Sequence, residues 1–383
     1  MQGLLSSIVG NIQSTFKNID WVLFGSVMVV ALFGLVTMNS FVGHTQYFNH
    51  QVVWLSISLV VFFLASTVDW RFIKKTSLIV TLYGIAIGML SLLFILGSVF
   101  KGAHSWFSIG ALSFQPANPI ELIIIFVLAK YFSRRHIEIA NIRHIIVSGL
   151  YVGIVFVLVL LQPDFGGAMI IFFLWLGMVL VSGISKKHLL AVFLIGLLAF
   201  GSAWFFVFKP YQKDRIKTFI HPLTNVLGTG YNAYQSTIAI GSGQVVGKGV
   251  GYGTQSKLQF LPEYQTDFIF AAFSEEWGFI GVILLFVLYG IIFWRMLAIA
   301  SRGGSNFEVL YGIGLVILFL VHAIIHIGGN IGLLPVTGNT LSFMSYGGSH
   351  LLVEFFGLGV LMGMKRYARP VHKESATNEM VGL

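Results

Sequence analysis

Several acidic residues of this chain stand in or beside long apolar stretches, where a charge is energetically expensive. Asp267 comes directly before one such stretch, and Glu275 and Glu276 follow it by eight and nine residues. Asp164 comes just before another apolar stretch. An ionisable group in such a position is by default functional: it lines a cavity, holds a cation or pairs with a residue of opposite charge.

Each of these carboxylates has more than one interpretation. Asp267 can serve as a general base, or it can stabilise the first turn of a helix through the helix dipole, with Thr266 as N-cap. In a continuous helix, Glu275 and Glu276 lie about 12–13 Å below Asp267. They can line a cavity, hold a divalent cation with Asp267, or pair with a basic residue. Asp164 either faces a cavity or caps the helix that follows it.

The composition decides the class of protein. Of the 383 residues, 56% are hydrophobic and 10% are charged, whereas soluble proteins carry about 25% charged residues. An ordinary soluble enzyme, a disordered protein and a nucleic-acid binder are therefore excluded, despite the net charge of +9. The absence of cysteine excludes disulfides, thiolate metal sites and a cysteine nucleophile. We expect an all-α, polytopic integral membrane protein.

A membrane-spanning helix needs about 20 mostly apolar residues. The hydropathy pattern predicts ten spans, of which the fourth and sixth are short. They are Trp21–Phe41, Gln51–Val68, Ser77–Val99, Pro119–Phe132, Ile145–Leu161, Gly167–Val181, Leu189–Phe208, Phe268–Phe293, Phe307–Ile327 and Gly347–Met364. The segment before the first span lacks the pattern of a signal peptide.

The basic residues predict the orientation. Sixteen of the 23 lysines and arginines lie at the termini and in alternate short loops, which are therefore expected to be cytoplasmic. Both termini are then inside, and the 58-residue segment 209–266 is a large extracytoplasmic loop between spans seven and eight. A loop of this length is usually functional or disordered. Its glycine-rich part lacks Walker A spacing, so we reject a nucleotide site of that type.

Motifs along about 250 residues resemble, in the same order, those of the RodA/FtsW/SpoVE (SEDS) family. The matching segments are Phe114–Pro116, Gln162–Asp164, Ile238–Gly249, Gly253–Ser256, Leu261–Glu263, Thr266–Phe270, Glu275–Glu276 with Gly278, Leu334–Gly338 and Ser345–Ser349. The passage Gly253–Ser256 favours the RodA branch. The predicted topology agrees with the resemblance.

The resemblance implies a peptidoglycan glycosyltransferase of the bacterial cytoplasmic membrane. Such an enzyme polymerises lipid II, a disaccharide-pentapeptide on undecaprenyl diphosphate, at the outer face of the membrane during cell-wall elongation and cell-shape maintenance. Its usual partner is a class B penicillin-binding protein, a transpeptidase. The chain then comprises a SEDS-type domain over 21–364, between cytoplasmic segments at 1–20 and 365–383. No organic cofactor is expected, and a divalent cation, Mg or Mn, is considered with Asp267 as its candidate ligand.

The resemblance also assigns roles to residues. Asp267 becomes the catalytic general base, because the family's Thr-Asp-Phe-Ile-Phe motif carries the essential carboxylate. The candidate substrate-binding residues are Trp106, Gln115, Asp164, Arg215, Lys248, Glu275, Glu276 and Ser349. Lys213 and Lys257 are further outward cations for the diphosphate, unless these bases form a solvated surface or attract anionic lipids. Trp106 is equally interpretable as an interfacial anchor, and Ser349 as a helix-packing residue.

The chain departs from the family pattern at several positions. After Gln-Pro the family commonly has Ser-Glu and then Lys three residues on, but Asn118 and Glu121 stand here, so that ion pair cannot form. Glu354 lies unexpectedly inside span ten. His322 and His326, four residues apart, favour interhelical hydrogen bonding over a metal site. These departures are compatible with three alternatives: a divergent active enzyme, an enzyme with an altered substrate, or a non-catalytic scaffold. A flippase or transporter of a lipid-linked precursor is a further alternative.

Overall fold

A computed structural model describes most of the chain. The described residues are 16–40, 45–100, 103–109, 112–133, 142–206, 208, 210–220 and 230–367. Each of the ten predicted spans coincides with one helix. These helices are α2 (Trp21–Asn39), α3 (Thr45–Thr67), α4 (Thr76–Leu96), α5 (Ala117–Ser133), α6 (Ile142–Leu161), α7 (Phe165–Val181), α8 (Lys186–Phe206), α12 (Ile269–Ala300), α13 (Asn306–Asn330) and α14 (Gly348–Tyr367).

Six of the described helices are long and apolar enough, by length and composition, to cross a membrane: α2, α3, α4, α6, α12 and α13. Helices α5 and α7 have 17 residues each, and α14 is less apolar because it carries Glu354, Lys365 and Arg366. The outer faces of the helices are apolar as well. In α8, for example, Phe193 and Leu198 are 66% and 71% exposed, which a lipid environment accommodates and water does not. The protein is an integral membrane protein.

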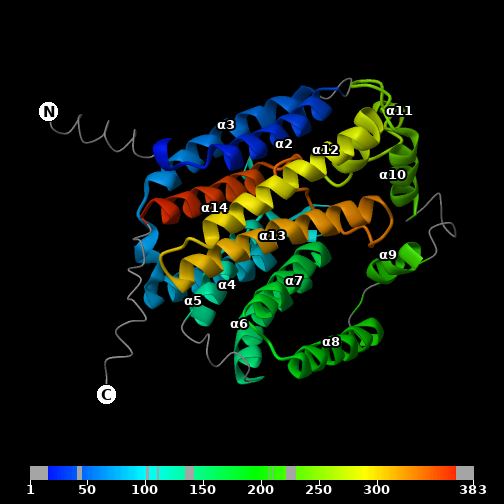
Figure 1. The fold of residues 1–383 in the computed structure, drawn as a ribbon. Helices are drawn as coiled ribbons and strands as arrows, with labels where there is room; N and C mark the ends of the chain where they lie inside the picture. The colour runs from blue at the N-terminus through cyan, green and yellow to red at the C-terminus, as the bar shows by residue number, and fades with distance from the viewer. Residues whose placement is uncertain are drawn as a thin grey trace, which may run out of the picture.

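The helices are arranged as a bundle with α13 near its centre (Figure 1). Helix α14 packs along α3, and α12 packs between α2 and α13. Helix α13 also contacts α5 and α7, so it joins helices from the first half of the sequence to those from the second half. Helix α8 lies at the periphery of the bundle (Figure 1).

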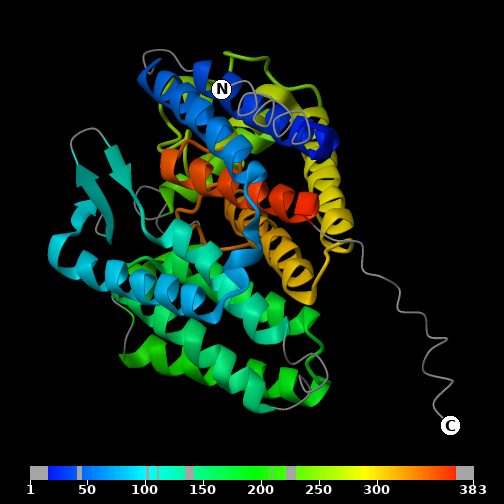
Figure 2. The same ribbon diagram turned by 90° about the vertical axis from the view of Figure 1, so that its left-hand side faces the viewer.

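One element departs from the all-helical expectation. Between α4 and α5 the chain forms a small antiparallel sheet, in the order β1 (Ser98–Phe100), β2 (Ala103–Ile109) and β3 (Leu112–Phe114). It projects from the bundle at the end of α4 (Figure 2). The hydropathy pattern did not predict this sheet, because strands of three to seven residues leave little periodicity to detect.

The segment between spans seven and eight contains secondary structure. It includes α9 (Pro210–Ile220), α10 (Tyr231–Ser242) and the single turn α11 (Thr254–Lys257). These helices gather at the end of the bundle where α12 begins and α13 ends (Figure 1). Residues 221–229 of the predicted loop lie outside the described residues.

Helix α12 is broken at Gly278, whose backbone (φ 64°, ψ −167°) is not helical. A break within a membrane leaves backbone groups that must find partners inside the protein. Here the amides of Lys248 and Gly249 donate to the carbonyls of Glu275 and Glu276, each at 3.0 Å. The two amides after the break donate to carbonyls of the same loop, at 2.9 and 3.1 Å. The break comes after Glu275 and Glu276, so the predicted span Phe268–Phe293 is interrupted beyond them, while α12 is unbroken from Ile269 through both glutamates.

The glycines of this loop allow its close approach to α12. A Cβ atom on Gly247 would lie 2.1 Å from the carbonyl oxygen of Glu276, and one on Gly278 would lie 2.2 Å from the amide of Gly247. Both distances are far inside van der Waals contact, so only glycine fits. The glycine-rich passage thus completes the backbone hydrogen bonding of a discontinuous helix.

Candidate active site

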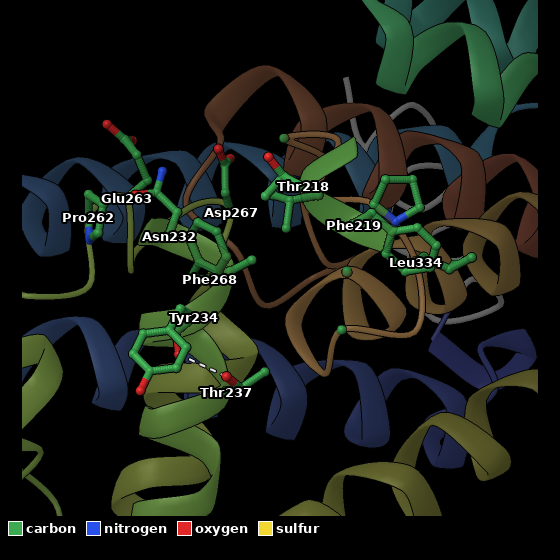
Figure 3. Close-up of a pocket in the computed structure, with 16 residues that line it drawn as sticks. Thr218, Phe219, Asn232, Tyr234, Thr237, Pro262, Glu263, Asp267, Phe268 and Leu334 are labelled. Carbon is green, nitrogen blue, oxygen red and sulfur yellow. Dashed lines mark hydrogen bonds between the residues drawn. The ribbon is translucent and has the colours of Figure 1, made fainter. Parts of the chain in front are cut away.

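A cavity of about 660 Å³ opens where α9, α10, the start of α12 and the segment after α13 meet (Figure 3). Asp267 and Glu263 supply carboxylates to its lining. Most of the other lining side chains are apolar or aromatic, such as Phe219, Tyr234 and Leu334. A few polar groups in a largely apolar cavity are typical of a ligand site.

The backbone around Asp267 is held from two directions. Asn330 of α13 donates from Nδ2 to the carbonyl oxygen of Asp267 at 3.0 Å, and its Oδ1 accepts from the amide of Ala271 at 3.2 Å. From the other side, the Ser345 hydroxyl donates to the carbonyl oxygen of Thr266 at 2.8 Å. Residues far apart in the sequence thereby set the position of the Asp267 backbone.

The start of α12 answers the question of the N-cap. The helix begins at Ile269, after Phe268, which makes no side-chain capping bond. Thr266 lies two residues before the N-cap, and its hydroxyl lies 3.2 Å from a carboxylate oxygen of Glu263. The prediction of Thr266 as N-cap is wrong, because Phe268 occupies the N-cap position.

Gly338 brings the Leu334–Gly338 motif against the Asp267 carboxylate. Its φ of 81° is in the left-handed region that favours glycine. A Cβ atom there would lie 3.6 Å from Asp267 Oδ2. Two motifs separated by about 70 residues in the sequence therefore line the same cavity.

Glu263 is a site residue that the sequence analysis did not single out. It belongs to the Leu261–Glu263 motif, which was the available signal. Its φ of 52° is rare for a residue with a side chain, and such backbone strain is concentrated at functional sites. Its carbonyl oxygen accepts from the amides of residues 266, 267 and 268, at 3.0–3.1 Å. The strained residue thus organises the turn that presents Asp267.

Tyr264, next in the chain, is excluded as a base. Burial, with smaller contributions from the neighbouring Tyr47 and Glu263, raises the pKa of its phenol to about 12. The hydroxyl is therefore protonated at neutral pH. Among these neighbours, the carboxylates of Asp267 and Glu263 are the groups that can accept a proton.

Glu275 lies in a different environment from Asp267. Its carboxylate is fully buried and forms an ion pair with Lys248, with 2.7 Å between Oε1 and Nζ. The Thr254 hydroxyl at 3.0 Å and the Gln255 amide at 3.1 Å also donate to it. Of the three roles considered for Glu275, pairing with a basic residue is the one observed. Lys248 is correspondingly engaged by Glu275.

Glu276 is also held by donors at a distance from the cavity. Its Oε1 accepts from the Ser40 hydroxyl and, at 2.9 Å, from the amide of Gly251. Neither Glu275 nor Glu276 lines the cavity of Asp267. The described part of the chain contains no group of three or more histidines and carboxylates suited to a metal ion. The proposed cation site shared by Asp267 with these glutamates is therefore not formed.

Gln115 and Asp164 are brought together at another place. Asp164 caps α7 by accepting from the Gly167 amide at 2.8 Å, so the capping interpretation is confirmed. Gln115 donates to the other carboxylate oxygen at 3.1 Å. Trp106 lies in β2, opposite Ser98. None of these residues is part of the lining of the Asp267 cavity.

The remaining candidates are Arg215 and Ser349. Arg215 belongs to α9, which borders the cavity through Thr218 and Phe219, and its side chain lies outside the described part of the structure. Ser349, at the start of α14, is buried and accepts a hydrogen bond from Asn118 at 3.2 Å. It packs α14 against α5, as the packing interpretation predicts.

The family is established by comparison with known proteins. The family model for FtsW, RodA and SpoVE, described as cell cycle proteins, matches residues 14–370. The chain belongs to this family. The resemblance inferred from the motifs is confirmed.

Relatives with 35% identity include proteins named for sporulation and for glycan synthesis. One is stage V sporulation protein E of Bacillus subtilis, with the match covering 84% of this chain and 87% of that protein. Another is the peptidoglycan glycosyltransferase MrdB of Escherichia coli, with 76% and 79% covered. At 34% identity, the chain also resembles a probable peptidoglycan glycosyltransferase FtsW of Thiomicrospira cyclica.

Solved structures resemble the whole membrane domain. A chain from a peptidoglycan synthase complex that coordinates polymerization and crosslinking superposes with a TM-score of 0.78, at 30% identity, over 91% of this chain and 99% of that one. The rod shape determining protein RodA of Thermus thermophilus superposes with a TM-score of 0.69, at 28% identity, over 91% and 97%.

Proposed function

We propose that this protein is a peptidoglycan glycosyltransferase that polymerises lipid II, with Asp267 as the general base. One observation carries the proposal: the motif carboxylate lines a cavity large enough for a ligand, at the end of a membrane-embedded bundle. The names of the relatives support the reaction class.

In the proposed reaction, Asp267 removes the proton from a sugar hydroxyl of the acceptor. That oxygen attacks the anomeric carbon of the donor with inversion, and the bond to the diphosphate oxygen breaks. The lipid diphosphate leaves with the electron pair. A correctly positioned general base accelerates such a step by about 10²–10⁴-fold.

The leaving diphosphate needs positive charge nearby. Because Lys248 is paired with Glu275, the bases of α9 are the better candidates among those predicted. Two residues of this helix, Thr218 and Phe219, line the cavity, and Lys213 and Arg215 belong to the same helix. We assign the diphosphate to this side of the cavity.

A divalent cation is compatible with the two carboxylates of the cavity. Mg²⁺ commonly binds through one or two carboxylates together with substrate phosphates, without an all-protein cage. Asp267 and Glu263 are the candidate ligands. The cation would offset negative charge on the diphosphate, while proton removal stays with Asp267.

We further propose that both termini are cytoplasmic and that the cavity faces the outside of the bacterial cytoplasmic membrane. The distribution of basic residues supports this orientation. A class B penicillin-binding protein is the proposed partner, and the similar synthase complex supports it. Cell-wall elongation is the proposed role.

The test is polymerisation by purified protein in detergent or liposomes, with lipid II, Mg²⁺ or Mn²⁺, and with or without the cognate transpeptidase. We expect glycan strands from the wild type and none from Asp267→Ala. If no condition yields strands while the protein moves lipid II across liposomes, the transporter alternative is correct. If neither is observed, the scaffold alternative gains support.

A further inference from the structure

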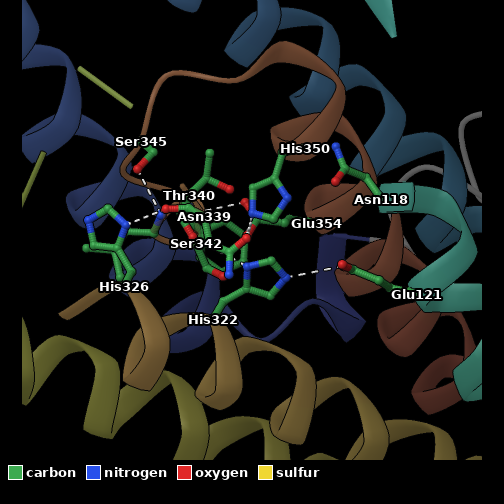
Figure 4. Close-up of polar contacts among 12 residues, drawn as sticks. Asn118, Glu121, His322, His326, Asn339, Thr340, Ser342, Ser345, His350 and Glu354 are labelled. Atoms are coloured by element: carbon green, nitrogen blue, oxygen red, sulfur yellow. Dashed lines mark hydrogen bonds and ion pairs between the residues drawn. The ribbon is translucent and has the colours of Figure 1, made fainter. Parts of the chain in front are cut away.

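A cluster of histidines and carboxylates is buried between α5, α13 and α14, apart from the cavity (Figure 4). His322 Nε2 lies 3.2 Å from Glu121 Oε2, and His350 Nε2 lies 2.9 Å from Glu354 Oε1. The two imidazole rings are adjacent, with 4.8 Å between their centroids. All four side chains are at least 91% buried.

This cluster stands where the family's expected Glu–Lys pair is missing. Asn118 occupies the position of the usual acid and donates to Ser349. Glu121 occupies the position of the usual base and pairs across helices with His322. Two acids and two histidines thus replace one acid and one lysine, and the prediction that His322 serves interhelical hydrogen bonding is confirmed.

The cluster is bonded to the segment that follows α13. Glu354 Oε2 accepts from the amide of Phe343 at 2.9 Å. One helical turn along α13 from His322, Nδ1 of the buried His326 lies 2.7 Å from the carbonyl oxygen of Asn339. These contacts fix residues 339–343, a stretch without regular helix or strand.

Residues next to this stretch, within 338–346, reach the turn around Asp267 through three contacts. Ser345 donates to the carbonyl of Thr266, Gly338 lies against the Asp267 carboxylate, and the Tyr346 amide donates to the carbonyl of Gln265 at 2.8 Å. Each contact lies within two residues of Asp267. A displacement of 339–345 would therefore displace the carboxylate.

We propose that the buried cluster of Glu121, His322, His350 and Glu354 is a positioning network for Asp267. Resting on the proposed function, the inference adds that the carboxylate–histidine contacts, one between α5 and α13 and one within α14, together with the segment 338–346, hold the general base in its reactive position. The residues act through Asp267 and do not touch the substrate. In this chain they take the place of the Glu–Lys pair.

The carboxylate of Glu354 offers the sharpest test. Glu354→Gln keeps an oxygen that accepts from the Phe343 amide, whereas Glu354→Leu removes it. Because a base displaced by about 1 Å can lower the rate by about 10²-fold, we expect Glu354→Leu to lower kcat by about 10- to 100-fold with little change in KM. Glu354→Gln should restore most of kcat.

Tyr311→Phe is the matched control. The Tyr311 hydroxyl donates to the carbonyl of Gly357 at 3.0 Å, so this change removes a buried hydrogen bond between α13 and α14, two of the three helices that hold the cluster, without touching the cluster. It should lower the melting temperature and leave kcat unchanged. Equal loss of kcat in Tyr311→Phe and Glu354→Leu would overturn the proposal, because general loosening of the bundle would explain both.

A second readout is independent of turnover. The chain has no cysteine, so Asp267→Cys places a single thiol at the cavity, and its rate of alkylation by a maleimide reports the position of residue 267. We expect this rate to change in Asp267→Cys/Glu354→Leu and to stay unchanged in Asp267→Cys/Tyr311→Phe. Unchanged rates in both would reject the positioning network even if no glycan is made. If the alkylation rate changes only in Asp267→Cys/Glu354→Leu, but the wild type makes no glycan, the positioning network is retained and the proposed function is rejected.

Discussion

Asp267 and Glu275 lie eight residues apart in the sequence, Asp267 just before α12 and Glu275 inside it. The surrounding protein contacts different groups of the two residues. At Asp267, the contacts from Asn330 and Ser345 hold the backbone, and the side chain lines a cavity. At Glu275, Lys248 and surrounding hydroxyl and amide groups hold the carboxylate itself.

The difference separates a group prepared for chemistry from a group that maintains the fold. A general base must exchange its proton, so its carboxylate has to reach a ligand. A buried carboxylate in a fixed set of donors stays ionised and joins the elements that supply them. Glu275 thereby fastens the loop 244–256 to the break in α12. Acidic residues close together in the sequence of a membrane protein therefore do not necessarily share a role.

The largest effect is expected from a substitution of Asp267, the proposed general base. Asp267→Asn should lower kcat by about 10²–10⁴-fold, since the amide cannot accept the proton. The melting temperature should change little, because asparagine keeps the size of the side chain and the backbone contacts from Asn330 and Ser345 are unaffected. Gel analysis of glycan strands and thermal unfolding in detergent measure the two quantities. Near-normal polymerisation by the variant would remove Asp267 from the mechanism.

The opposite pattern is expected at Glu275. Glu275→Gln should lower the free energy of unfolding by about 2 kcal/mol, because it leaves Lys248 beside a neutral group. The folded fraction should retain kcat. Lys248→Met and the double variant complete a cycle, in which the double change should be less damaging than the sum of the single ones. A loss of kcat with unchanged stability would instead place Glu275 in the reaction.

Gly338 and Gly332 sharpen the comparison within the cavity itself. Both line it and both have left-handed backbone, with φ of 81° and 77°. Alanine at either position should lower the stability by about 1–2 kcal/mol. Only the Gly338→Ala methyl group faces Asp267, whereas that of Gly332→Ala faces Thr237 at 3.8 Å. We expect a lower kcat for Gly338→Ala alone, and equal kcat values would show that the contact is unimportant.

The smallest effect concerns a third carboxylate, near the other end of α12. Asp20 caps α2 at Leu23 and pairs with Arg295. Burial alone would raise the pKa of Asp20, but the bonds from Arg295 and Leu23 lower it below its ordinary value of 3.8. Asparagine also caps helices, so Asp20→Asn should lower the stability by only about 1 kcal/mol.

The pH dependence of that effect follows from the sign of the shift. The lowered pKa means that the folded protein favours the ionised form, so the stabilisation is complete above the ordinary value of 3.8. It disappears as the pH falls through the lowered pKa. The difference in melting temperature between wild type and Asp20→Asn should therefore shrink in acid. A constant difference would show that the ion pair contributes nothing.

Much of the fold could be predicted because a membrane imposes a simple pattern. Ten apolar stretches correspond to ten helices, since each must satisfy its own backbone in the lipid. The sheet at 98–114 and the break at Gly278 could not be predicted in this way. Both depend on partners supplied by other segments: the strands pair with one another, and the break is completed by the loop at 244–249.

The candidate site was predicted only in part. Asp267 and the motif at 334–338 do share a cavity, whereas Glu275, Glu276 and Lys248 form contacts elsewhere. Their spacing from Asp267 gives a distance along a helix, but it cannot say which donors surround each carboxylate. Glu263 was missed because its importance comes from the unusual backbone angle that presents the Asp267 turn.

By itself the sequence determined the class of protein, the spans, the family and Asp267 as the candidate base. These follow from hydropathy and from ordered motifs, which are properties of the chain read in one dimension. Only the tertiary structure decided which charges are paired inside the protein and which line the cavity. That division depends on contacts such as Lys248–Glu275 and His322–Glu121, whose partners are 27 and 201 residues apart.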